Sequence, residues 1–382
     1  MACCSLYAHA ADGRRTVVTD SVYVEPDTID AAARRHLADS LAREKHKRTF
    51  FHRVGNLFTR FFREFDNTDS TYIEPQHYNY TVMLQNTNTY EQYTLSNKDG
   101  QSVSFAPDVS YRMGPYVGWR WVFLGYTVDL KNIGFWTHNT SKKEFDLSLY
   151  SSMLGVDLFW RETGNDYHIQ KVDVGNDVDM SAMHGVDFDG FKSSIKGFNL
   201  YYIFNHRRFS YPAAYSQSTV QRRSAGSALA GIGFTRHTLD VDWTNLEQVI
   251  QDKMGDAWGQ KFNQSIKQST VSYSSFSLSG GYSYNWVFAH NFLFNASLSA
   301  ALAYNHTSSN GENEEKKSHQ LFNFSNFNID GIGRFALVWN NTRWYAGASC
   351  IIHSYNYQKS QFSTNNSFGS LNIYFGVNFG RR

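Results

Sequence analysis

Long segments in which apolar and polar side chains alternate residue by residue constrain this chain more than any other feature. In 292–304 an apolar series alternates with a series of Ser, Asn, Ala and Leu, and 276–286 and 371–379 repeat the pattern. Successive side chains of a β-strand point to opposite faces, so each segment predicts a strand with one mostly apolar face. The fold class is therefore expected to be all-β.

The length of these segments favours a membrane barrel over a soluble sheet. They run to nine residues or more, whereas strands in soluble sheets usually have about five or six. Trp286, Trp339 and Trp344 stand near segment ends, as in the aromatic girdles of membrane barrels. Because backbone groups in lipid must all be paired, only a closed sheet is viable there. We predict an antiparallel transmembrane up-and-down β-barrel in a Gram-negative outer membrane, with a soluble β domain as the alternative.

Segment by segment, the alternation gives about twelve strands. A turn-like sequence at 163–166 leaves fourteen strands as the alternative. An even number places both ends of a bacterial barrel on one side. The longer connections (161–194, 241–270, 306–320 and 358–367) then face outward, except that 207–225 becomes a long periplasmic loop. The strands are expected at 77–86, 89–96, 101–112, 116–130, 143–160, 195–206, 226–240, 271–286, 291–305, 321–339, 343–357 and 368–379.

The first 66 residues differ from the rest of the chain. Residues 1–11 end in an Ala-His-Ala sequence of the form that signal peptidase accepts, and we interpret them as a signal-peptide remnant, with a cytosolic N-terminus as the alternative. Residues 12–66 are expected to form a basic helical arm before a barrel over 67–382. An apolar stripe at helical spacing predicts an amphipathic helix that lies at a membrane interface, docks on the barrel or meets a periplasmic protein. The interface residues of this stripe are Leu57, Phe58, Phe61, Phe62 and Phe65.

Composition excludes several classes of protein. Charged residues make up 18% of the chain, below the roughly 25% of soluble domains, while 16% aromatic residues rule out disorder. A net charge of +2 argues against a nucleic-acid-binding protein. The sequence has no GxSxG or HExxH motif, and its three cysteines have no ligand spacing. We therefore predict no catalytic residue, no metal and no cofactor.

Charged residues on polar strand faces are candidates for the barrel lumen. Asp330 and Arg334 share a polar face with Asn328, and four residues of strand separate the two charges by roughly 13 Å. Each charge therefore needs a partner on another strand, and Arg120, at a strand start, is one candidate. These four residues are predicted to line the lumen, where charges either tune a pore or hold a small barrel together.

The 207–225 loop carries two pairs of arginines that flank a Tyr-Pro sequence. Four guanidinium groups close together could bind a phosphate or a carboxylate, and the alternative is an ordinary hydrated loop. The candidate anion-binding residues are Arg207, Arg208, Arg222 and Arg223.

Two segments at the predicted outer side have weaker patterns. Asp177, Asp179 and Ser181 have the spacing of a calcium loop, but the Gly and Glu that such a loop requires are absent, so a hydrated loop is expected. Residues 242–258 predict a helix with Thr244 and Glu247 as its capping box. This helix could cap the barrel mouth, plug the lumen, or simply pack.

Eight stretches together resemble one known family, the domain of unknown function 4421, which is found in Bacteroidetes and regarded as a family of outer-membrane barrels. The resemblance covers roughly residues 50–382 and implies fold and location, without catalytic residues to carry over. The stretches are TYIEPQHYNY (71–80), VMLQNT (82–87), GPYVGWRW (114–121), EFDLSLY (144–150), GFNLYYIFNHR (197–207), GFTRHT (233–238), NIDGIG (328–333) and WNNTRWYAGA (339–348).

Three functional hypotheses remain open from the sequence. The first is a small pore or transport-related barrel, the second a structural or interaction barrel with a filled lumen, and the third a membrane-embedded lipid-acting enzyme. A lumen filled by 207–225 or 242–258 would favour the second over the first. The expected partners are outer-membrane lipid and, through the arm, a periplasmic protein; nucleic acid is not expected.

Overall fold

A computed structural model describes residues 68–119, 122–125, 128–129, 143–164, 166–175, 178–255, 262–307, 326–358 and 362–381. The chain divides into two compact units, Met1–Arg63 and Glu64–Arg382, and every described residue belongs to the second. The predicted signal-peptide remnant, the arm with its stripe of Leu57, Phe58, Phe61, Phe62 and Phe65, and Arg120 lie outside the described residues.

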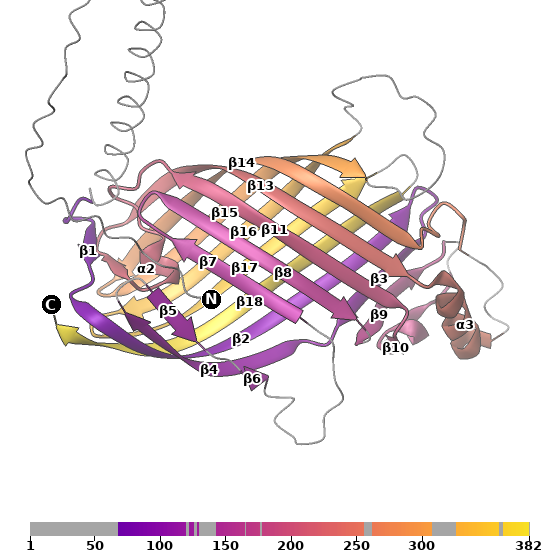
Figure 1. Cartoon of the computed structure of the whole chain (residues 1–382), viewed down its shortest axis with the longest axis horizontal. Helices are drawn as coiled ribbons and strands as arrows, with labels where there is room; N and C mark the ends of the chain where they lie inside the picture. Colours follow the sequence, from indigo (N-terminus) through magenta and orange to yellow (C-terminus); the bar gives the residue numbers. More distant parts are fainter. Residues whose placement is uncertain are drawn as a thin grey trace, which may run out of the picture. The chain divides into compact units, whose positions relative to one another are not determined.

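Strands dominate the described part of the chain (Figure 1). The helical elements are η2 (Ser181–Met183), α2 (Pro212–Tyr215) and α3 (Trp243–Met254). The strands are β1 (Ile73–Pro75), β2 (Tyr78–Asn97), β3 (Ser102–Pro107), β4 (Ser110–Trp119), β5 (Val122–Gly125), β6 (Val128–Asp129), β7 (Lys143–Tyr150), β8 (Leu154–Gly164), β9 (Tyr167–Asp173), β10 (Val186–Phe188), β11 (Phe191–Ile203), β12 (Thr219–Gln221), β13 (Ala225–Val241), β14 (Thr270–Ala289), β15 (Phe292–Thr307), β16 (Phe327–Asn340), β17 (Trp344–Gln358) and β18 (Phe362–Arg381).

One antiparallel sheet of 16 strands contains every described strand except β1 and β12, which pair with each other. Its order is β10-β9-β3-β2-β18-β17-β16-β15-β14-β13-β11-β8-β7, and β4 pairs with β2, β5 and β6. β18 pairs with β2, so the ends of the barrel sequence meet. The described part of the wall is not closed, because β7 pairs only with β8 and β5 and β6 pair only with β4; β10, at the end of the extension, is also an edge strand. The predicted antiparallel transmembrane β-barrel is confirmed. β3, β9 and β10 extend the sheet beyond the barrel wall, and β5 and β6 both pair with the same strand, β4. When β5 and β6 are counted as one strand, the wall has twelve strands.

Several predicted strand boundaries were wrong, although the total is close. Segments 77–86 and 89–96 are one strand, β2, while 143–160 is a hairpin of β7 and β8. The turn at 151–153 contains no Gly, Pro or Asn to mark it, and it is closed by Ser151, whose backbone N–H donates to the Leu154 carbonyl at 2.8 Å. The turn-like sequence at 163–166 leads into β9, which pairs with β3 and β10 rather than with β8. The connection predicted at 358–367 is confined to 359–361.

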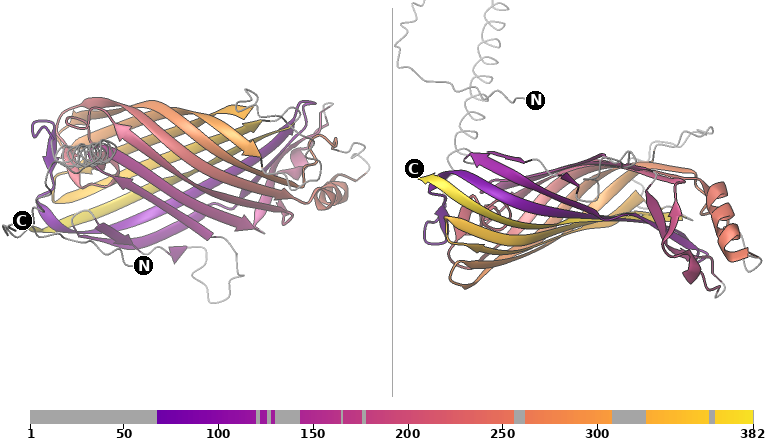
Figure 2. Two further views of the ribbon diagram at one scale, coloured as in Figure 1. Left: turned by 45° about the horizontal axis from the view of Figure 1, so that its top comes forward. Right: turned by 90° about the horizontal axis from the view of Figure 1, so that it is seen from below.

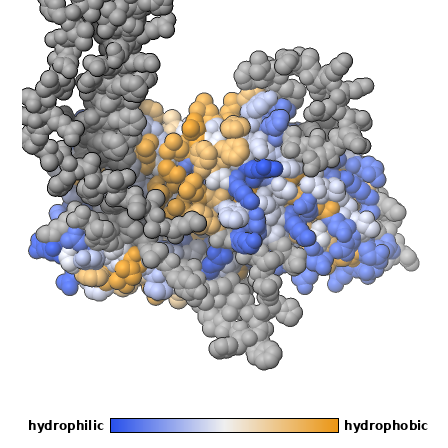
Figure 3. Space-filling view, viewed as in Figure 1, coloured by the Kyte–Doolittle hydropathy of each residue, from blue (hydrophilic) through white to orange (hydrophobic). Residues whose placement is uncertain are grey.

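The two faces of the wall have opposite chemistry. The outward-facing Leu278, Leu298 and Ile329 are 66%, 64% and 68% exposed, whereas the inward-facing Asn285 and Asn295 are fully buried. A soluble sheet would bury the apolar face instead. On the face seen in Figure 3, hydrophobic residues gather in a band over the part of the sheet nearer α2, and hydrophilic residues cover the part nearer α3. This arrangement suits a barrel whose outer surface contacts lipid.

Aromatic side chains border the apolar band on both sides. On β14, Trp286 lies at one border and Phe276 at the other, both exposed. Ten residues of a strand tilted by about 40° rise by roughly 26 Å along the barrel axis. That height matches the apolar band of about 25 Å that crosses a bacterial outer membrane.

The two ends of the barrel differ in their connections. We name the end with the β7–β8, β14–β15 and β16–β17 turns the turn end, and the opposite end the loop end. β1 and the last residues of β18 lie at the turn end, and α3 lies at the loop end (Figures 1 and 2). The exception predicted from the sequence is present: the long connection between β11 and β13 emerges at the turn end.

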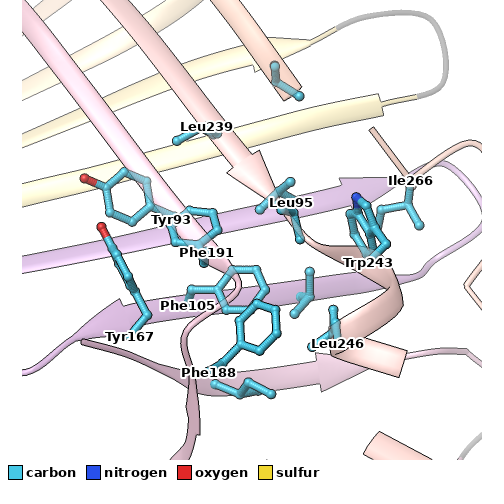
Figure 4. Packing of buried hydrophobic residues seen from close by; sticks show 14 of the residues in the cluster. Tyr93, Leu95, Phe105, Tyr167, Phe188, Phe191, Leu239, Trp243, Leu246 and Ile266 are labelled. Carbon is cyan, nitrogen blue, oxygen red and sulfur yellow. The ribbon is translucent and has the colours of Figure 1, made fainter. Parts of the chain in front are cut away.

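A hydrophobic cluster closes the loop end. The inward faces of β3, β9 and β10 pack with β2, β11 and α3, and Phe105, Phe188 and Phe191 stack in its centre (Figure 4). Helix α3 contributes Trp243 and Leu246. We name this cluster the cap. No helix in the described part of the chain is both long and apolar enough to cross a lipid bilayer.

The N-cap of helix α3 lies two residues before the one that the sequence predicted. Its N-cap is Asp242, whose carboxylate accepts from the backbone N–H of Asn245 at 3.0 Å. The predicted capping box of Thr244 and Glu247 is therefore wrong. Glu247 instead pairs with Lys267 at 2.6 Å. Of the roles that the sequence left open for this helix, capping the mouth agrees with the burial of its apolar side in the cap.

Candidate functional site

The connection between β11 and β13 folds back into the barrel. We name residues 204–224 the plug segment. Its buried residues include Phe209, Tyr211, Ala213 and Ala214, and the two alanines belong to α2. Burial on this scale requires partners for the polar groups that are carried inside with the apolar ones.

Side chains of four wall strands supply these partners. On β15, Asn295 accepts from the hydroxyl of Tyr215 at 2.6 Å. Gln217 donates to the Tyr374 hydroxyl of β18 at 2.9 Å and accepts from Asn340 of β16 at 3.0 Å. On β14, Asn285 donates to the backbone carbonyl of Ser210 at 2.8 Å. These four strands belong to one side of the wall, the run from β14 to β18. From the other side, Tyr150 of β7 stacks on Tyr211 and Tyr215 with centroids 5.8 and 5.3 Å apart, so the plug segment is held across the lumen.

Two ion-pair groups in the lumen are centred on buried arginines, Arg334 and Arg161. Arg334 of β16 pairs with Asp157 of β8, and both side chains are at most 5% exposed. The Arg334 guanidinium also lies over the ring of Tyr201, 4.8 Å from its centroid. Asp157 accepts a second hydrogen bond from Ser148 at 2.7 Å. Since β8 and β16 are not neighbours in the sheet, this pair ties opposite walls together.

The second group is centred on Arg161 of β8. Its guanidinium contacts Glu91 of β2 at 3.2 Å and Asp146 of β7 at 2.6 Å. The side chain of Glu91 is fully buried and also accepts from the Tyr93 hydroxyl at 2.9 Å. The ring of Phe368 lies 4.7 Å from the Arg161 guanidinium. A buried charge needs such compensation, because its desolvation costs several kcal/mol.

Aromatic rings of the wall strands extend the buried cluster of the cap toward these ion pairs. Phe159 of β8 packs against Phe368 of β18 and His353 of β17, with centroids 5.3 and 5.7 Å apart. Tyr273 of β14 stacks on Tyr357 of β17 at 4.3 Å. The space left between β7, β8, β17 and β18 is a cavity of about 40 Å³, enough for about one water molecule. A larger cavity of about 630 Å³ adjoins Glu91 and Phe368, where β3 and β4 diverge along β2. Side chains therefore occupy most of the described lumen between the plug segment and the cap.

The residues predicted to line the lumen are partly placed by the structure. Asp330 and Arg334 face inward and are buried, and Asn328 is half-buried on the same strand. Asp330 accepts from the backbone N–H of Asn356 at 2.9 Å. The partner of Arg334 is Asp157, which the sequence interpretation missed. If 143–160 were one strand, Asp157 would lie on the same face as Phe145. The hairpin at 151–153 instead turns Asp157 to the opposite, inward face.

The four arginines of the plug segment do not form one cluster of open guanidinium groups. Arg222 pairs with Glu74 of β1, and Arg208 lies 3.7 Å from Asp69. The guanidinium groups of Arg208 and Arg223 lie 5.1 and 5.8 Å from the ring of Tyr72. The backbone carbonyl of Arg207 accepts from the N–H of Asp69 at 2.8 Å. With the β1–β12 pairing, these contacts fasten residues 69–75 to the plug segment.

Lowering the pH is expected to loosen this attachment. Partial burial alone would raise the pKa of Glu74, but the hydrogen bond and charge of Arg222 outweigh it, and the pKa lies below its ordinary value of 4.5. Stability from the ionised carboxylate is thus fully present above pH 4.5 and is lost as the pH falls through the lowered pKa. Hydrogen exchange should show residues 73–75 and 219–221 losing protection under acid, earlier than the paired strands of the wall.

Glu74→Gln is the matched variant for this prediction. It should lower the protection of β1 already at neutral pH, because the charge that holds Arg222 is gone, and should remove most of the acid-induced change. Equal protection in the two proteins at every pH would contradict the role given to the Glu74–Arg222 pair.

The segment with calcium-loop spacing, for which a hydrated loop was expected, is only partly described. Asp177 lies outside the described residues, and Asp179 accepts from the backbone N–H of Ser181 at 2.9 Å. The described part of the chain contains no group of three or more His, Cys, Asp or Glu side chains arranged to hold a metal ion.

Solved structures similar to this chain are outer-membrane proteins, at low similarity. OprG from Pseudomonas aeruginosa matches with 9% identity, a TM-score of 0.21, and coverage of 80% of this chain and 98% of OprG. The toluene transporter TodX of P. putida matches with 8% identity, a TM-score of 0.19, and coverage of 80% and 91%. The transport unit of the autotransporter AIDA-I from Escherichia coli matches with 10% identity, a TM-score of 0.29, and coverage of 78% and 90%.

Comparison with curated proteins gave no significant match. A family model, by contrast, matches residues 67–379, which is most of the chain and all of the described barrel except the last two residues of β18. The model is that of the domain of unknown function DUF4421, the family that the sequence stretches indicated. The chain therefore belongs to the DUF4421 family.

Proposed function

We propose that this protein is an outer-membrane barrel that is closed to solutes and serves as a structural or interaction component. The observation that carries the proposal is the plug segment, which occupies the turn end of the lumen and is hydrogen-bonded to β14, β15, β16 and β18. The buried ion pairs and the cap fill the remaining length. A pore would require at least the plug segment and the Arg334–Asp157 pair to move.

The orientation proposed for the barrel follows from its two ends. Membrane barrels have short turns in the periplasm and longer loops outside. The turn end would then face the periplasm, and the cap would form a rigid surface outside the cell. The first described residues, 68–75, lie at the turn end with β1, and we retain the arm predicted over 12–66 as the contact for a periplasmic protein.

Conductance in planar bilayers tests the closed state. The full chain, with insertion checked by its heat-modifiable gel mobility, is expected to give no current steps over a range of voltages at which a general porin conducts in the same lipid. Steady steps whose number follows the amount of inserted protein would overturn the proposal.

A variant locates the seal. Tyr215→Ala with Gln217→Ala removes the contacts of the plug segment to Asn295, Tyr374 and Asn340. If this variant conducts while the unmodified protein does not, the plug segment is the seal. If both remain silent, the ion pairs and the cap seal the lumen.

A further inference from the structure

Two cations lie side by side on the outward face of the wall. Strand register aligns Phe145 of β7, Trp160 of β8, Lys196 of β11 and Arg236 of β13 in one row across four neighbouring strands. The Cβ atoms of directly opposed residues on antiparallel strands lie about 5 Å apart, and like charges there destabilise the sheet. Lys196 and Arg236 therefore need negative charge nearby.

The chain supplies only part of that charge. Glu162 contacts Lys196 at 3.1 Å and Lys143 at 3.9 Å, so one carboxylate serves two ammonium groups. Arg236 is exposed and forms no ion pair with any described residue. The three cations and one carboxylate leave a charge of +2 at this place.

An apolar groove adjoins the cations on the side of the turn end. It has a volume of about 360 Å³, and its walls include Phe145, Leu158, Trp160, Phe198 and Phe234, with Lys196 at its border. Directly behind the cations, the next row of the register is Leu158, Phe198, Phe234 and Phe276. The stem of Lys196 extends over the Trp160 ring, with its ammonium 4.8 Å from the ring centroid.

The position of the groove restricts what can occupy it. The groove is lined by exposed apolar side chains of the outward face, and the charged row of Lys196 and Arg236 adjoins it. We therefore place the groove among hydrocarbon chains and the cations at the depth of lipid headgroups. A soluble anion would use the cations but not the groove, and a neutral lipid would use the groove but not the cations. A phosphate oxygen accepts strong charge-assisted hydrogen bonds from Lys and Arg.

We propose that this surface binds a phosphate-bearing membrane lipid, with an acyl chain in the groove and the phosphate between Lys196 and Arg236. Outer-membrane lipid was predicted from the sequence as a general partner, and this proposal gives it a defined binding site on the protein. The lipid site rests on the proposed orientation of the barrel in one respect only, the leaflet that supplies the lipid. If the loop end faces outward, the lipid belongs to the outer leaflet.

Native mass spectrometry of the full chain in detergent tests the site, with diphosphoryl lipid A as probe and phosphatidylcholine and inorganic phosphate as comparisons. The unmodified protein is expected to retain lipid A in preference to phosphatidylcholine. Lys196→Gln with Arg236→Gln should weaken lipid A binding roughly tenfold or more, because two charge-assisted contacts are lost. Leu158→Trp, which fills the groove but keeps the cations, should weaken it as well.

The matched control removes two exposed cations elsewhere at the loop end, Lys98→Gln with Lys171→Gln, and should leave lipid A binding unchanged. Heat-modifiable mobility verifies that each variant is folded. Equal retention of both lipids, or equal loss in the control, would overturn the proposal in favour of unspecific lipid contact. Full competition by inorganic phosphate would replace it with a simple anion site. The conductance result does not depend on any of these outcomes.

Discussion

Arg334→Met is expected to destabilise the barrel by about 3–5 kcal/mol. The substitution leaves the Asp157 carboxylate buried in the lumen, where the hydroxyl of Ser148 is its remaining hydrogen-bond donor among the described residues. Methionine fills most of the space but supplies no positive charge, so the cost is that of an uncompensated buried charge. Urea unfolding of the protein in lipid vesicles, followed by tryptophan fluorescence, measures the change.

The double variant Arg334→Met with Asp157→Leu separates charge from packing. Replacing a whole buried ion pair by apolar residues is often neutral or stabilising, so the double variant should recover most of the stability lost in the single one. A single variant that costs less than about 1 kcal/mol, or a double variant as unstable as the single, would show that the pair does not hold the walls together.

The alternation of apolar and polar residues was the most informative part of the sequence. In a strand, the position of a residue alone determines the face to which its side chain points. Leu298 and Asn295 differ by three positions and therefore lie on opposite faces, and the structure gives them opposite environments. Where a turn has no characteristic residue, as at 151–153, the rule gives the wrong face: with 143–160 as one strand, Asp157 would share the face of Phe145. One missed turn reverses the phase of every residue that follows it in the segment.

Contacts across the lumen could not be predicted from a single sequence. Arg334 and Asp157 are 177 positions apart, and no local pattern states which strands face each other in a closed sheet. The polar face of 327–339 indicated only that Asp330 and Arg334 needed partners. Finding them required the strand order and the register.

The plug segment did carry a sign of its location that composition could have revealed. Residues 209–221 contain no charged residue, although charged arginines flank them on both sides. Exposing the aromatic side chains of Phe209, Tyr211 and Tyr215 in a periplasmic loop would cost free energy. Tyrosine combines a large apolar surface with one hydrogen-bonding group, so it suits a lumen lined by both apolar and polar side chains. An uncharged, aromatic loop in a membrane barrel thus favours a segment that folds inward.

Leu298→Arg should be the most damaging change on the outer surface. Leu298 lies midway between Phe292 and Tyr304 on the outward face of β15 and is 64% exposed. Arginine at the midplane of a membrane barrel costs about 2–4 kcal/mol, and the cost falls to about 0–1 kcal/mol near the interface. Tyr304→Arg, six residues along the same face, is therefore the matched control, and urea unfolding in vesicles compares the two.

The dependence on depth distinguishes lipid from water as the surroundings of this face. If water surrounded it, arginine would be accommodated at both positions and neither variant would lose stability through its charge. If the face packed against another protein layer, both positions would suffer from the added volume. Only a hydrocarbon layer centred near Leu298 penalises the first variant and spares the second, because the arginine at 304 can reach the headgroups with its long side chain.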